Sequence, residues 1–271
     1  MIAFASNSLL CRLALKNTKI DAASFTCVRI LSGAVALWLI LKIRRARWKK
    51  AGNWISALSL FIYAAAFSFA YLQLSAGTGA LLLFGAVQAT MILWGFREGE
   101  RLDWIQILGL TMAVIGLVIL VVPGLTAPPL TASILMLGAG VAWGIYSLRG
   151  KSEQNPTNAT AGNFLRAVPF ALLLSLAFIS RIDLNPVGLV YAIVSGAITS
   201  GFGYVIWYSA LPNLKATSAA TVQLSVPVLA ATGGILFLGE SITLRYLLAS
   251  VVILGGIALV ILERRVKQAK L

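Results

Sequence analysis

Acidic residues, histidine and cysteine are scarce in this chain of 271 residues. It has 8 Asp and Glu residues, no histidine and two cysteines, Cys11 and Cys27. The cysteines lack the spacing of metal ligands, and no cluster of Asp, Glu, His or Ser marks a catalytic centre. No glycine-rich phosphate-binding loop is present, which excludes an ATP-driven pump in this chain. We therefore expect a protein without metal or cofactor that is not an enzyme.

Charge is low as well, and apolar residues take its place. Hydrophobic residues make up 59% of the chain and charged residues 11%, against roughly 25% charged in a typical soluble domain. Residues 104–122 and 246–262 are apolar runs that approach the length of about 20 residues needed to cross a bilayer as a helix. Because the hydrocarbon layer offers no water, backbone polar groups must be paired within each segment. The sequence therefore predicts an all-α integral membrane protein.

The apolar runs predict about ten transmembrane helices. Their expected ranges are 2–16, 24–43, 53–74, 78–97, 103–122, 131–149, 160–179, 186–209, 217–238 and 244–262. The net charge of +14 gathers in short loops, which favours a topological role over nucleic-acid binding. On one side these residues include Arg44, Arg45, Arg47, Lys49 and Lys50; on the other they are only Lys16, Lys19, Arg181 and Arg245. The positive-inside rule then predicts a multi-pass inner-membrane protein with both termini in the cytoplasm.

An internal repeat divides the chain. Pairs of matching residues at an offset of 137 are Arg12 with Arg149, Asp21 with Asn158, and Arg29 with Arg166. Gly99-Glu100 matches Gly239-Glu240 at an offset of 140. Asp21 and Asn158 are candidate N-caps for the second helix of each half. Two domains follow, residues 1–124 and 131–271, and five spans in each invert the second relative to the first. Inverted repeats are typical of transporters with a substrate site near the membrane midplane.

Polar and aromatic residues within the spans are the candidates for that site. The predicted substrate-binding residues are Asn7, Tyr63, Phe67, Gln88, Trp94, Trp143, Tyr146, Tyr204, Trp207 and Gln223. Aromatic walls with a few amide and hydroxyl groups suit a zwitterion with an apolar side chain. The alternative interpretation is that Trp and Tyr form interfacial belts or fill gaps between helices.

Four arginines lie within or beside spans, at positions 12, 29, 149 and 166. Each is within reach of an interface by snorkelling, so a structural role is the favoured interpretation, and a carboxylate or phosphate partner is the functional alternative. Glu100 and Glu240 are expected to orient chain turns. No Asp or Glu lies in the middle of a span, so no carboxylate proton relay is visible, which favours facilitated transport.

Three segments carry a resemblance to a known family. They are "DAASFTCVRILSG" (21–33), "GFREGERLDWIQILGLTMAVIGLVIL" (95–120) and "PVLAATGGILFLGESITLRYLLASVVILGGIALV" (227–260). With them the chain resembles the ten-helix EamA-type branch of the drug/metabolite transporter superfamily, and within it most the YddG-type exporters of aromatic and other amino acids. The resemblance implies a basket-like bundle whose cavity is lined mainly by spans 1, 3, 4, 6, 8 and 9, with spans 5 and 10 peripheral.

The expected function is export of small organic metabolites, most of all aromatic or large apolar amino acids, by facilitative alternating access. The expected partners are the amino acid substrate and the lipid bilayer, and the sequence leaves the oligomeric state open. A second hypothesis is exchange of anionic metabolites such as sugar phosphates, which needs several of the four arginines to face the cavity. A membrane enzyme or a channel is the alternative from another class.

Overall fold

The computed structural model describes residues 1–44, 51–97, 104–122, 124, 127–151, 153, 155–210, 223 and 225–268. The helices are α1 (Ile2–Asn17), α2 (Ala22–Ile43), α3 (Trp54–Tyr71), α4 (Ala76–Arg97), α5 (Trp104–Val121), α6 (Leu130–Lys151), α7 (Pro156–Ala177), η1 (Ile179–Arg181), α8 (Pro186–Val194), η2 (Ser195–Phe202), α9 (Gly203–Ala210), α11 (Ser225–Leu238) and α12 (Leu244–Gln268). α8, η2 and α9 run on as one span, so each of the ten predicted segments overlaps a described helix. Residues 217–222 of the ninth predicted segment lie outside the described residues.

Seven of the described helical spans are long and apolar enough to cross a membrane, and α11 and the 244–259 part of α12 are shorter apolar helices. The all-α membrane fold that the sequence predicts is confirmed. Asp21 caps α2 as predicted, because its side chain accepts from the Ser24 N–H. The third span begins at Asn53 as predicted, and the Asn53 side chain accepts from the Ser56 N–H. The cap predicted at Asn158 is wrong. Asn155 caps α7 instead, because Pro156 fits the first helical turn and extends the helix to an earlier start.

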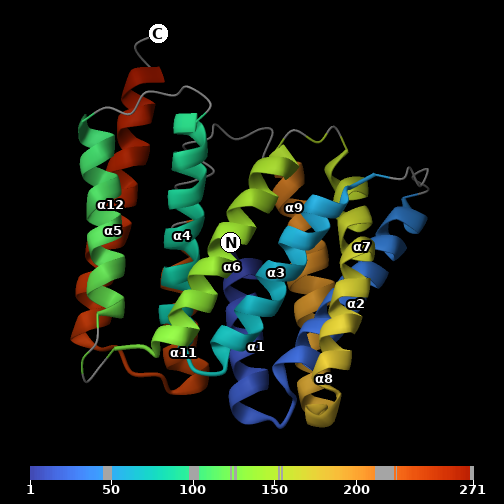
Figure 1. The fold of residues 1–271 in the computed structure, drawn as a ribbon. Helices are drawn as coiled ribbons and strands as arrows, with labels where there is room; N and C mark the ends of the chain where they lie inside the picture. Colours follow the sequence, from blue (N-terminus) through green and yellow to red (C-terminus); the bar gives the residue numbers. More distant parts are fainter. Residues whose placement is uncertain are drawn as a thin grey trace.

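The two halves pack in a reciprocal pattern. α1 packs against α11 as α6 packs against α4, and η2 packs against α1 as α3 packs against α6. α5 packs mainly against its counterpart α12, and this pair stands at one side of the bundle (Figure 1). This exchange of contacts is what a twofold relation between the halves requires, and the domain bounds 1–124 and 131–271 stay a prediction. It also places α5 and α12 away from the centre.

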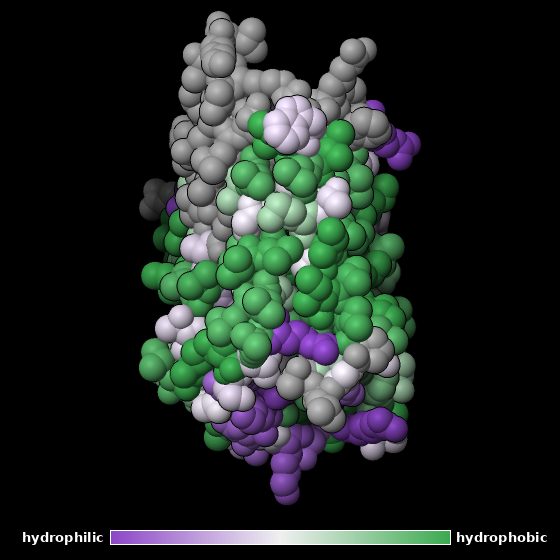
Figure 2. All heavy atoms as spheres, turned by 90° about the vertical axis from the view of Figure 1, so that its left-hand side faces the viewer, coloured by the Kyte–Doolittle hydropathy of each residue, from purple (hydrophilic) through white to green (hydrophobic). Residues whose placement is uncertain are grey.

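The side of the bundle formed by α5 and α12 is strongly apolar. Figure 2 shows it as a broad hydrophobic band with hydrophilic residues gathered below. Val118, Leu247 and Val251 are exposed on these two helices, Val251 to 72%. A face of this size would drive aggregation in water, whereas lipid tails cover it without cost.

Loops at the two ends of the bundle give reference points for the site. We call the end with residues 18–21, 72–75, 178–185 and 239–243 the outer end, after the orientation that the basic residues predict; it is at the bottom of Figure 1. The inner end holds residues 51–53, 153 and 155 and the C-terminal end of α12.

Candidate functional site

An aromatic cluster fills the middle of the bundle. We define it as Tyr63 and Phe67 on α3, Trp143 and Tyr146 on α6, and Tyr204 on α9, all buried. The ring centroids of Tyr63 and Trp143 are 4.9 Å apart, and those of Trp143 and Tyr204 are 4.8 Å apart. These are ordinary distances for stacked or tilted aromatic pairs. Five of the predicted site residues therefore come from three helices to form one group.

Asn7 of α1 ties this cluster to the span formed by α8, η2 and α9. Its Nδ2 donates to the Tyr63 hydroxyl at 3.2 Å, and its Oδ1 accepts from Ser195 at 2.5 Å and from Thr199 at 3.3 Å. Asn7 lies ten residues from the outer end of α1, a depth of about 15 Å. That is about half of the ~30 Å hydrocarbon layer, so the polar contacts lie near the midplane.

Arg29 of α2 is the only charged residue in this group, and its position corrects the sequence interpretation. Its side chain does not snorkel to an interface: it is 2% exposed, and its Nη2 donates to the Tyr63 hydroxyl at 3.0 Å while its Nε donates to Ser200 at 3.3 Å. The guanidinium carbon lies 5.1 Å from the ring centroid of Tyr63 and 4.9 Å from that of Phe67. Nη1 has no hydrogen-bond partner.

A close helix contact brings Ser200 to Arg29. A Cβ on Gly196 of η2 would lie 2.1 Å from the Arg29 carbonyl oxygen, so only glycine allows the two backbones to meet there. η2 itself is a π-helix, an arrangement that is rare and frequent at functional sites. The wider turn presents Ser195, Thr199 and Ser200 on the side of α1 and α2.

The other predicted site residues lie apart from the cluster or at its edge. Gln88 is buried in a narrow space where α4 meets α5 and α12, which is not the centre of the bundle. Trp94 is 43% exposed near the inner end of α4 with the Arg97 guanidinium 6.0 Å from its ring, as in an interfacial belt. Gln223 is buried, and its Oε1 has no hydrogen-bond partner.

Trp207 lies where the cluster meets a groove near the inner end. Phe4 joins it there, and its ring centroid is 6.0 Å from that of Trp207 and 5.8 Å from that of Trp143. The groove has a volume of about 540 Å³, and its lining comes from the start of α1, from α9 and from the start of α11. Its walls are mostly apolar.

An ion pair joins α1 to the α11–α12 turn at the outer end. Arg12 Nε lies 3.3 Å from Glu240 Oε1, the one salt bridge within the described residues, with the two side chains 14% and 11% exposed. Glu240 Oε2 also accepts from the Ala76 N–H at the start of α4, and Arg12 Nη1 donates to the Tyr71 carbonyl. Gly239 ends α11 with a positive φ of 63°, a conformation that favours glycine, and so turns Glu240 toward α4.

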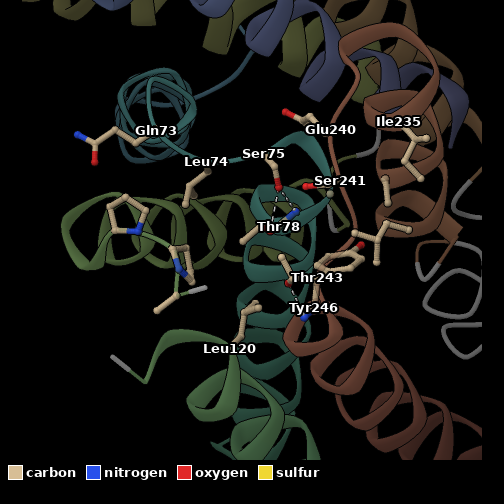
Figure 3. Close-up of a pocket in the computed structure, with 16 residues that line it drawn as sticks. Gln73, Leu74, Ser75, Thr78, Leu120, Ile235, Glu240, Ser241, Thr243 and Tyr246 are labelled. Carbon is tan, nitrogen blue, oxygen red and sulfur yellow. Dashed lines mark hydrogen bonds between the residues drawn. The ribbon is translucent and has the colours of Figure 1, made fainter. Parts of the chain in front are cut away.

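Glu240 therefore orients a chain turn, as the sequence predicts, and joins three elements in doing so. Glu100 lies outside the described residues. Beside the ion pair is a cavity of about 260 Å³, whose polar lining includes Ser75, Thr78 and Thr243 (Figure 3). This cavity lies between the α3–α4 turn and the start of α12 and is separate from the aromatic cluster.

The remaining two arginines hold the inner end. Arg149 donates to Ser56 and to the Asn53 side chain. Arg166 donates to the carbonyls of Ala51 and Gly162. Three of the four arginines thus bind groups at helix ends and loops, as the structural interpretation predicts, and Arg29 is the exception.

Four residues that lie around the aromatic cluster were missed by sequence reasoning. Ser195, Thr199 and Ser200 carry no signal of their own, because Ser and Thr in membrane helices usually bond to their own backbone, as Thr199 also does with the Ser195 carbonyl. Phe4 was missed because a phenylalanine in an apolar span is one of many similar side chains and gives no signal of its own.

Comparison with known proteins agrees with this arrangement. The sequence matches the EamA-like transporter family over residues 1–122 and 130–262. It is 54% identical to an uncharacterized protein of Pseudomonas aeruginosa over all of this chain and 94% of the relative. It is 30% identical to the threonine/homoserine exporter RhtA of Escherichia coli over 85% of this chain and 78% of the relative. A protein crystal structure with 18% identity shares the fold, with a TM-score of 0.69 over 97% of both chains. The chain belongs to the EamA-like transporter family, and it is a transporter rather than an enzyme.

Proposed function

We propose that this protein exports amino acids from the cytoplasm by facilitative alternating access, with a preference for aromatic or large apolar side chains. The observation that carries the proposal is that the aromatic cluster lies near the membrane midplane with Asn7 and Arg29 in contact with it. Tyr63, Trp143 and Tyr204 provide aromatic surface, and Asn7 and Arg29 provide polar atoms beside it. A zwitterion with an apolar side chain needs both kinds of contact in one place.

The threonine/homoserine exporter supports amino acids as the substrate class, since its name gives two of them and it shares 30% identity with this chain. The aromatic cluster supports the finer placement near the YddG-type exporters. Rings of Phe, Tyr and Trp pack well against other rings, with about 0.5–1.5 kcal/mol per pair beyond burial. We propose the aromatic preference on this ground.

The two ends of the bundle support alternating access. The Arg12–Glu240 pair closes the outer end, while a groove with Phe4 and Trp207 in its lining lies near the inner end. A conformation closed outside and open toward the inside is one of the two that export requires. The proposed location is the inner membrane, with both termini in the cytoplasm.

Exchange of anionic metabolites is a weaker candidate. It needed several of the four arginines to face the cavity, but Arg12, Arg149 and Arg166 bind carbonyls, side chains at helix ends and a glutamate. The single positive charge of one buried arginine balances one carboxylate but leaves part of the charge of a phosphate group, about −1.5 to −2, uncompensated.

The test is uptake of labelled tryptophan, phenylalanine and threonine into liposomes that contain only the purified protein, without an imposed gradient. We expect saturable uptake that unlabelled amino acids compete away. Trp143→Ala and Tyr146→Ala should each reduce it. If both variants transport as well as the unmodified protein, the site assignment is wrong; if no amino acid is taken up with or without a proton gradient, the proposed substrate class is wrong.

A further inference from the structure

Arg29 is buried at a cost that nothing around it offsets fully. A guanidinium in the interior of a bundle loses its hydration, and such charges are normally paired with a carboxylate. Within the described residues Arg29 forms no ion pair. Its bonds go to two neutral hydroxyls, those of Tyr63 and Ser200, and Nη1 is left without an acceptor.

The repeat provides an internal comparison for this residue. Arg166 is the counterpart of Arg29 in the second half, and it satisfies one guanidinium nitrogen with two backbone carbonyls, those of Ala51 and Gly162. At this repeat-related position an arginine can therefore stabilise the end of the bundle by bonding to backbone carbonyls, as Arg166 does. The Arg29 side chain does not bond to backbone carbonyls at the end of the bundle. It turns inward instead and lies against the rings of Tyr63 and Phe67.

A second buried donor belongs to the same group. The hydroxyl of Tyr204 lies beside that of Tyr63 and makes no hydrogen bond of normal geometry, and its ring centroid is 4.8 Å from that of Trp143. Arg29 Nη1 and the Tyr204 hydroxyl are both donors that need an acceptor. A carboxylate has two oxygens with about four lone-pair sites and can satisfy more than one donor at once.

We propose that Arg29 binds the α-carboxylate of the substrate, with Nη1 donating to one carboxylate oxygen and the Tyr204 hydroxyl assisting. The inference rests on the proposed function, because it assigns one group of the amino acid to one side chain of the site. The negative charge of the carboxylate compensates the buried guanidinium, and the substrate side chain then faces the rings of Trp143 and Tyr146. A substrate without a carboxylate leaves the guanidinium unpaired and is rejected.

The experiment measures equilibrium binding to the purified protein for three probes: phenylalanine, phenylalaninol, which has the ammonium but no carboxylate, and 3-phenylpropionate, which has the carboxylate but no ammonium. Unmodified protein should bind phenylalanine about 10- to 100-fold more tightly than phenylalaninol, the range typical of a hydrogen bond to a charged group. In Arg29→Gln the affinities for phenylalanine and phenylalaninol should differ by no more than about threefold. Arg29→Lys keeps the charge without the planar fork and should give an intermediate ratio.

Arg166→Gln is the matched control, since it removes the repeat-related arginine that bonds to carbonyls. It should lower the melting temperature and leave the ratio of the two affinities unchanged. Arg29→Gln should leave the melting temperature of the ligand-free protein unchanged or raise it, because it removes an uncompensated buried charge. If Arg29→Gln does not fold, the ratio of the phenylalanine and phenylalaninol affinities is measured for Arg29→Lys and Tyr204→Phe instead. Both variants should lower this ratio.

The outcomes separate the two proposals. Phenylalanine binding with a ratio that Arg29→Gln and Arg29→Lys leave unchanged would overturn the role of Arg29 and keep amino acids as substrates. Binding of 3-phenylpropionate that depends on Arg29, with no binding of any amino acid, would overturn the proposed function and keep the carboxylate site. Binding of none of the three would overturn both.

Discussion

Neutralising Glu240 should open the outer end of the transporter. The carboxylate pairs with Arg12 at 3.3 Å and accepts from the Ala76 N–H at 2.8 Å. Glu240→Gln retains an acceptor for the N–H and loses the ion pair. A hydrogen bond to a charged group contributes about 1.5–3 kcal/mol, and the pair is mostly buried, so we take about 2 kcal/mol for the closed form. That corresponds to a shift of about 30-fold toward the open form.

Cys11 reports this opening without an added label site. It is next to Arg12 on α1 and fully buried in the closed form. The chain has only one other cysteine, Cys27, so Cys27→Ser leaves a single thiol. In intact cells treated with a membrane-impermeant maleimide, Glu240→Gln in this background should label Cys11 up to about 30-fold faster, because labelling follows the open population.

Glu153→Gln is the control for this prediction. It removes the same charge from the inner end, where the Glu153 backbone N–H donates to the Gly150 carbonyl, and should leave the Cys11 labelling rate unchanged. Equal Cys11 labelling rates with and without Glu240→Gln in the Cys27→Ser background would refute the view that the Arg12–Glu240 contact holds the outer end closed.

Three further predictions follow from the site. Trp143→Ala should reduce phenylalanine uptake by at least tenfold, since it removes the ring that contacts Tyr63; unchanged uptake would show that the ring is only a packing residue. Gln88→Leu should leave uptake within twofold of normal, because Gln88 lies between α4, α5 and α12; a larger loss would place the substrate path there. Gly196→Ala should cost about 1–3 kcal/mol of stability through overpacking against α2, whereas at Gly138, with nothing within 4 Å of a Cβ, alanine should be neutral or stabilising in a thermal unfolding assay.

The spans were predictable from the sequence because length and hydropathy decide them. All ten predicted segments correspond to described helices, and caps such as Asp21 and Asn53 lie where short polar side chains precede apolar runs. The start of α7 was misplaced by a few residues because two asparagines, Asn155 and Asn158, compete for the cap. Pro156 decides between the two, because proline fits the first turn of a helix that begins directly after Asn155.

The site was less predictable because helix faces are hidden in membrane segments. A helix that is apolar all round gives no periodic signal for the side that faces the centre. The structure brings Tyr63 and Trp143 together, whereas Gln88 and Trp94 of α4 lie in other surroundings. Arg29 was expected to reach an interface, and its depth depends on the tilt of α2 and on its contact with η2, neither of which sequence spacing reveals.

The most direct test of the central claim is to map where a substrate analogue binds. Membranes with the protein are photolysed with 4-azidophenylalanine, and the labelled residues are identified by mass spectrometry, with excess phenylalanine as competitor. We predict competed labelling on α3, α6 and α9, around Tyr63, Trp143 and Tyr204. Competed labelling confined to the outer cavity near Thr78 and Tyr246, or to the lipid-facing side of α5 and α12, would contradict the claim that the aromatic cluster is the amino acid site.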